Sequence, residues 1–173
     1  PSPLARADGK KLPVATMRDL VEGQVRAEIA RIAEALHLRS VVDRRLDAQP
    51  DAQLVVCGDF NDTPRSLTVR VVAGDGAAAS RAAFDQAVLG APTALAGRAL
   101  HACGDGIQGR AETIAWRGIP ETIDHMLVSE SLWSRFEGAS VHNERLGEVS
   151  AALGAEVNAA LESDHAPMLA RFV

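Results

Sequence analysis

Three short stretches of the sequence carry the carboxylate, amide and imidazole groups that acid–base and metal chemistry use. In the first, Asp59 and Asn61 follow the apolar run 53–58. They stand two positions apart, so their side chains start on the same side of an extended backbone. The carboxylate can accept a proton or bind a cation, and the carboxamide can donate to a phosphoryl oxygen. The stretch 59–62 alone fits a simple turn and helix cap equally well.

The other two stretches each contain an Asp-His pair. Asp124 stands early in an apolar run, 122–128, where an unpaired carboxylate would be costly. It therefore needs a partner, and an imidazole or the backbone at a strand edge could serve. His125 should point to the opposite face and is not a candidate. Asp164 and His165 precede the last apolar run and could supply an oxygen ligand and a titratable base, although such dipeptides are also common in solvated loops.

Two other motifs in the sequence do not fit their usual structural context. A calcium loop starting at Asp59 would need glycine at its sixth position and glutamate at its twelfth, where the chain has Pro64 and Arg70. Residues 104–109 match the Gly-x-Gly-x-x-Gly pattern. No strand is predicted before them and no helix after them, so a dinucleotide site is not expected.

The hydrophobic pattern predicts mixed α/β structure that brings these stretches to strand ends. Residues 18–47 read as a helix with one apolar face, formed by Val21, Val25, Ile29, Ile32 and Leu36 and continued loosely by Val42 and Leu46. The run 53–58 reads as a buried strand, in which Cys57 would be a buried free thiol.

After the turn at 59–64, Thr63 is expected to cap a short helix from Pro64 to about residue 72, ended by Gly74. A further helix is predicted at 80–88, and a loop with one helical turn at 90–110. Strands are predicted at 112–116 and 122–128, joined by a turn at 117–120, and then at 138–142 and 166–173. A helical turn is expected at 129–134 and partly helical structure at 147–161.

The bulk composition is that of an ordinary globular domain. The 173 residues are 47% hydrophobic and 24% charged, enough to build one core. The net charge of -5 is not that of a tight, sequence-independent nucleic-acid binder. Two cysteines do not make a disulfide framework. We find neither an apolar run of about 18 residues nor an apolar N-terminal signal segment.

Taken together, the three stretches resemble a known superfamily. Gly-Asp-Phe-Asn at 58–61, Ile-Asp-His at 123–125 and Ser-Asp-His-Ala-Pro at 163–167, in that order and each at a strand edge, are similar to the endonuclease/exonuclease/phosphatase superfamily. The resemblance runs from about residue 18 to 173. It implies a DNase I-like α/β sandwich of two sheets flanked by helices. Residues 1–17 would be a lead-in loop, and 18–173 a partial domain with one mostly antiparallel or mixed sheet.

The resemblance also implies roles for five residues. Asp59 would orient the attacking water and Asn61 would contact the scissile phosphate. His165 would bond a phosphoryl oxygen or act as acid and base, with Asp124 fixing and charging its ring. Asp164 would be a ligand on the metal side, and the metal would be Mg²⁺ or Mn²⁺. The reaction would be in-line attack of water on phosphorus.

The chain also departs from the superfamily. An Asn, a metal-binding Glu and a His of the N-terminal half of such proteins have no counterpart here, so we expect this chain to be the C-terminal half, inactive alone. Its bare inner sheet face should lead to self-association or to binding of the missing half. The alternative is a non-catalytic association module that keeps the fold. Nuclease, lipid phosphodiesterase and sugar-phosphate phosphatase all remain open as activities.

Overall fold

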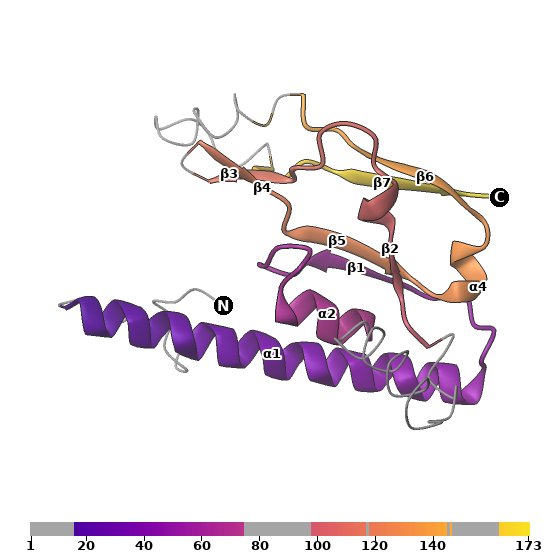
Figure 1. Ribbon diagram of the computed structural model, residues 1–173, viewed down its shortest axis with the longest axis horizontal. Coiled ribbons are helices and arrows are strands. Elements are labelled where there is room, and N and C mark those ends of the chain that lie inside the picture. The colour runs from indigo at the N-terminus through magenta and orange to yellow at the C-terminus, as the bar shows by residue number, and fades with distance from the viewer. Residues whose placement is uncertain (1–15, 75–97, 117, 145, 147–162) are drawn as a thin grey trace, which may run out of the picture.

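The computed structural model describes residues 16–74, 98–116, 118–144, 146 and 163–173 (Figure 1). Its elements are α1 (Met17–Ala48), β1 (Val55–Asp59), α2 (Leu67–Ala73), β2 (His101–Ala102), the 3-10 helix η2 (Cys103–Gly106), β3 (Ile114–Trp116), β4 (Ile119–Glu121), β5 (Asp124–Val128), α4 (Glu130–Trp133), β6 (Phe136–Val141) and β7 (Met168–Phe172). Helices combined with antiparallel sheets confirm the predicted class, a mixed α/β protein consistent with a DNase I-like fold. The helix predicted at 80–88 and the segment 147–161 lie outside the described residues.

Helix α1 starts and ends within one residue of its predicted limits, 18–47. Thr16 caps it, with its hydroxyl accepting from the amide of Asp19 while the Asp19 carboxylate accepts from the amide of Thr16. However, the predicted apolar face is largely exposed as far as Leu36, and Ile29 is 62% exposed. The buried residues of α1 are the small Gly23, Ala27 and Ala35, together with Val42 and Leu46, which the prediction placed at the end of the apolar face. Small side chains let a helix pack closely against its neighbours. Hydrophobic periodicity alone does not predict that such a face will be the buried one.

The principal core lies between the helices and one face of the sheet β1–β5–β2. Figure 1 shows α1 and α2 on one side of β1 and β5, with β6 and β7 on the other. Leu127, fully buried in β5, packs with Val56 of β1 and Ala102 of β2 in this core. Alternate residues of these strands, such as Asp124, therefore point away from the helices.

Strand β1 is more exposed than its apolar sequence predicts. Its side chains alternate, so Val56 packs against the helices while Val55 is 48% exposed and Cys57 is also exposed. The predictions of a strand buried on both faces and of a buried Cys57 are therefore wrong. Among the described residues, β1 lies at the edge of its sheet and only one of its faces is covered.

Helix α2 begins three residues later than predicted. Ser66, rather than Thr63, is its N-cap, and the Ser66 hydroxyl accepts from the amide of Val69 at 3.3 Å. A turn precedes it, with the Ser66 amide donating to the Thr63 carbonyl. The helix ends as predicted at Gly74, whose φ of +70° suits a residue without a side chain.

The predicted hairpin of 112–116 with 122–128 is replaced by two separate ladders. Strand β3 pairs with the short β4, whereas β5 pairs with β1 and β2. The residues between β4 and β5 carry the chain from one sheet to the other. The predicted strand 138–142 appears as β6 and pairs with β7. The helical turn predicted within 90–110 is η2, but β2 before it was not predicted. In the described part of the chain, helices are too short or too polar to cross a membrane.

Candidate active site

Antiparallel pairing of β1 with β5 sets Asp59 directly opposite Asp124. Both residues point away from the helices, because the intervening alternate residues face the core. Asp59 is exposed, whereas the side chain of Asp124 is only 23% exposed. Two carboxylates facing each other across a ladder repel, so this end of the sheet favours a cation.

The imidazole of His165 reaches this end of the sheet from a distant part of the chain. Its Nδ1 lies 2.8 Å from Oδ2 of Asp124, 41 residues away in sequence. An ionised carboxylate can only accept a hydrogen bond, so Nδ1 carries the proton and donates it. The His165 amide donates to the Ser163 hydroxyl at 3.1 Å, which fixes the backbone beneath the ring. The side chain is 27% exposed, and its contact with Asp124 uses Nδ1 and leaves Nε2 out of that hydrogen bond.

The surrounding carboxylates favour the charged form of His165. Burial of the ring by itself lowers the pKa, but the hydrogen bond to Asp124 and the negative charges of Asp124, Asp59 and Asp164 outweigh it. The net result is a pKa raised above the ordinary value for histidine. When protonated, the ring is a positively charged hydrogen-bond donor among three acidic residues.

Asn61 lies in the loop after β1, where a hydrogen bond to the Asp59 side chain fixes its backbone. The Asn61 amide donates to Oδ1 of Asp59 at 2.7 Å, which closes a tight local turn. This turn places Asn61 in the left-handed region, with a φ of +51°, a conformation that asparagine tolerates better than most residues. Asn61 is exposed in the loop that directly follows Asp59, the last residue of β1. The structure therefore places Asp59, Asp124 and His165 at one end of the sheet, with Asn61 beside Asp59.

His125 contacts this loop from the helix-facing side of β5. As strand alternation predicted, it points to the face opposite Asp124. It is 7% exposed, and its Nε2 donates to the carbonyl oxygen of Asp62 at 2.8 Å. Its ring also meets Phe60 edge-on, with ring centroids 5.3 Å apart. Its contacts are therefore those of a buried supporting residue. The sequence indicated its direction but not this contact with the loop.

A buried threonine that sequence reasoning missed lies between the Asp124 and His165 segments. Thr113 is fully buried, and its hydroxyl accepts from the amides of Ile123 and Asp124, at 3.1 and 3.2 Å. Its carbonyl accepts from the amide of Ala166 at 2.7 Å. A lone threonine in an apolar run is an ordinary strand residue, so the sequence carried no signal for these contacts.

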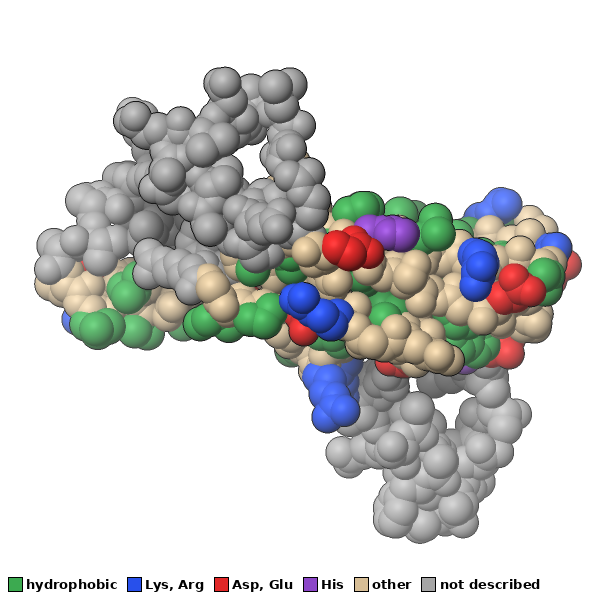
Figure 2. Space-filling model, turned by 90° about the horizontal axis from the view of Figure 1, so that it is seen from above, with side chains coloured by type: hydrophobic (Ala, Val, Ile, Leu, Met, Phe, Trp, Pro, Cys, Tyr) green, Lys and Arg blue, Asp and Glu red, His purple; other side chains and the backbone are tan. Residues whose placement is uncertain are grey.

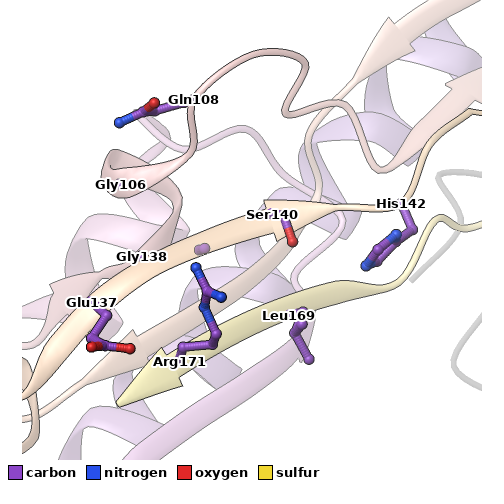
Figure 3. Close-up of a pocket in the computed structure, with 9 residues that line it drawn as sticks. Gly106, Gln108, Glu137, Gly138, Ser140, His142, Leu169 and Arg171 are labelled. Atoms are coloured by element: carbon purple, nitrogen blue, oxygen red, sulfur yellow. The ribbon is translucent and has the colours of Figure 1, made fainter. Parts of the chain in front are cut away.

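A hollow of about 390 Å³ lies on the outer face of β6 and β7 (Figure 3). Figure 3 shows Glu137 and Arg171 toward one end and His142 toward the other. Its lining contains none of the five predicted site residues. Its charges are of both signs, and the hollow is open to solvent.

The described residues do not form a complete metal centre. Among them, no group of three or more histidine, cysteine, aspartate or glutamate side chains is arranged to hold a metal ion. Asp164 is half-buried beside His165, but one such ligand does not define a site.

The chain matches the model of a known protein family. The model of the Endonuclease/Exonuclease/phosphatase family matches residues 6–165 of the chain. This range contains all five residues predicted to form the site. No significant match was found among curated proteins or among solved structures.

Proposed function

Because this chain belongs to the endonuclease/exonuclease/phosphatase family, we propose that it serves in the hydrolysis of phosphate esters. It would supply the groups that act on the attacking water and on the phosphate. The observation that carries this proposal is the 2.8 Å contact of His165 with Asp124, at the strand end where Asp59 stands opposite Asp124. A cationic donor beside an exposed carboxylate suits an anionic phosphate and a water molecule.

In this proposal His165 donates a hydrogen bond from Nε2 to a phosphoryl oxygen. Its raised pKa, despite partial burial of the ring and owing to the neighbouring carboxylates, favours the imidazolium. In its protonated form the ring would act as a donor that stabilises the charge developing on the phosphoryl oxygens. Asp124 holds the ring through Nδ1 and thereby fixes where Nε2 points.

Asp59 and Asn61 act on the opposite side of the phosphorus. One oxygen of Asp59 already accepts from the Asn61 amide, which leaves the other free to orient water for in-line attack. The Asn61 carboxamide, held on the same turn, donates to a phosphoryl oxygen. The turn thus couples the position of the attacking water to that of the phosphate.

The family generally depends on a divalent metal, and we propose that Asp164 contributes to a Mg²⁺ or Mn²⁺ site. Carboxylate oxygen suits both ions. When bound, such an ion polarises a phosphoryl oxygen and lowers the pKa of its water. The described residues contain no cluster sufficient for the site, so further ligands would come from other residues. Because the superfamily's N-terminal Asn, Glu and His have no counterpart in the sequence, we propose that this chain alone is inactive and becomes active as part of a longer chain.

The experiment measures Mg²⁺-dependent hydrolysis of bis(p-nitrophenyl) phosphate by this chain and by one extended with its native upstream sequence. Asp59→Ala and His165→Gln should each lower kcat of the active form by roughly 100-fold or more. The control His142→Gln alters a histidine of the β6–β7 hollow and should leave the rate unchanged. Full activity in both site variants would contradict the proposal.

The substrate class stays open. Figure 2 shows basic side chains scattered singly among acidic and apolar ones on the described part of that face, without a continuous basic area. Together with the net charge of -5, this gives no specific support to a nucleic-acid substrate. Comparing a short DNA duplex, a phospholipid headgroup ester and a sugar phosphate in the same assay would separate the three possibilities.

The second candidate function is that of an association module without catalysis. It is favoured by the exposed apolar side chains along α1 and on the open face of β1, among them Val25 at 53% and Val55 at 48% exposed. Such surfaces usually become covered by another protein surface. A longer chain that binds a partner or itself tightly, yet hydrolyses none of the phosphate esters, would favour this function.

A further inference from the structure

Thr113 forms four hydrogen bonds although its side chain has only one hydroxyl. Its amide donates to the carbonyl of Glu121 at 2.8 Å, and its carbonyl accepts from the amide of Ala166 at 2.7 Å. Its hydroxyl oxygen accepts from the amides of Ile123 and Asp124. The residue is fully buried, so these contacts are shielded from competing water.

These contacts join two segments that no strand ladder connects. Asp124 begins β5, which pairs with β1 and β2, while His165 precedes β7, which pairs with β6. Within the described residues, no backbone hydrogen bond links 123–124 directly to 165–166. Thr113 links them instead, with its hydroxyl on the Asp124 side and its carbonyl on the His165 side. An isolated antiparallel β-bridge between Ile114, the residue after Thr113, and His165 adds to this connection.

We propose that Thr113 is a positioning residue that sets the alignment of the Asp124 carboxylate with the His165 ring. Its hydroxyl fixes the backbone from which the Asp124 side chain starts. Its carbonyl fixes the backbone directly after His165. The inference rests on the proposed function for its relevance to catalysis, but its structural content is independent of whether the chain hydrolyses any ester.

The hydroxyl group is the essential part of this side chain. The amides of Ile123 and Asp124 lie where the chain crosses from one sheet to the other, and both are satisfied by the same oxygen. A hydroxyl oxygen has two acceptor lone pairs, and a methyl group of the same size has none. Without the hydroxyl both amides would lack a partner in the interior, and the Asp124 backbone would shift to find one.

The test compares Thr113→Val with Thr68→Val in the metal-free chain. Thr68 is a matched control, because it is 4% exposed and its hydroxyl has no hydrogen-bond partner. The first readout is amide hydrogen exchange at residues 123 and 124. The second is the tautomer of the neutral His165 ring, read from its ¹⁵N chemical shifts. The contact with Asp124 holds the Nδ1–H tautomer, whereas an unconstrained imidazole prefers Nε2–H.

Thr113→Val should raise the exchange rates at 123 and 124 by roughly tenfold or more and shift His165 toward the Nε2–H tautomer. Thr68→Val should change neither. If Thr113→Val does not fold, Thr113→Ser and Thr113→Ala give the same comparison, because both lose the methyl group and only serine keeps the hydroxyl. The serine variant should then retain the Nδ1–H tautomer and the alanine variant should lose it.

An unchanged His165 tautomer in a folded variant without the hydroxyl would overturn the inference while leaving the proposed function untouched. Conversely, a shift of the tautomer in a chain whose extended form hydrolyses no ester would support the positioning role and remove the proposed function. A lower melting temperature alone would indicate only structural support, and it counts against the inference when the tautomer is unchanged.

Discussion

Asp124→Asn tests the electrostatic centre of the site with almost no change in side-chain volume. The substitution removes the charge that faces His165 across 2.8 Å. A hydrogen bond to a charged group contributes about 1.5–3 kcal/mol when buried, and an exposed ion pair about 0–1 kcal/mol. The two side chains are 23% and 27% exposed, so an intermediate loss of about 1 kcal/mol is expected. That corresponds to roughly fivefold in the unfolding equilibrium and about 3 °C in Tm.

The loss should depend on pH in a defined direction. The folded chain raises the pKa of His165, since the hydrogen bond to Asp124 and the charges of Asp124, Asp59 and Asp164 outweigh burial. A raised folded pKa contributes stability that is fully present below the unfolded value, about 6.5, and is lost as the pH rises through the folded value. The difference in unfolding free energy between the native chain and Asp124→Asn should therefore be larger at pH 6 than at pH 9.

Thermal unfolding at pH 6 and pH 9, in buffer containing EDTA, measures this difference, and NMR titration of the His165 ring measures its pKa. Asp124→Asn should lower that pKa. The control is Glu144→Gln, which alters an exposed pair in which Glu144 lies 3.8 Å from His142 and the two side chains are 76% and 56% exposed. It should leave the His165 pKa unchanged. The reasoning is refuted if Asp124→Asn leaves the pKa where it was, or if its destabilisation grows toward high pH.

The remaining predictions concern the cysteines and the exposed apolar face of α1. Burial raises the pKa of the Cys103 thiol to about 11. At pH 8 a disulfide reagent should therefore modify the exposed Cys57 quickly and the buried Cys103 only after unfolding. Equal modification rates of the two thiols in the native chain would contradict the assigned burial. Val25 and Ile29 are 53% and 62% exposed, so we expect the chain to self-associate. The double variant Val25→Glu, Ile29→Glu should then shift it toward monomer in light scattering coupled to gel filtration, and a native chain that is monomeric at high concentration would exclude this association.

Local sequence determined much of the secondary structure. Apolar residues spaced three or four positions apart predicted α1, and the predicted and observed ends differ by one residue. Gly74 marked the end of α2 because the left-handed conformation there favours glycine. The β-branched and apolar run marked β1. These signals work because each depends on the geometry of a few neighbouring residues.

Local sequence did not determine which surface each element buries. The predicted apolar face of α1 is largely exposed as far as Leu36 and is buried only at Val42 and Leu46, whereas Ala27 and Ala35 outside that face are buried. Cys57 follows the same pattern, since an apolar strand is buried on both faces only when both are covered, and the described structure covers one face of β1. Burial depends on which elements come together, and that choice is made by the whole chain.

The same division applies to the candidate site. The sequence by itself supplied the types of group and, through the resemblance of three motifs, their shared chemistry; strand alternation also separated Asp124 from His125. Only the tertiary structure decided that His165 meets Asp124 across 41 positions and that Asp59 stands opposite Asp124. It also decided that Thr113 connects the two segments. Hydrogen bonds between distant segments are fixed by the packing of the sheets that carry them, and no local pattern encodes that packing.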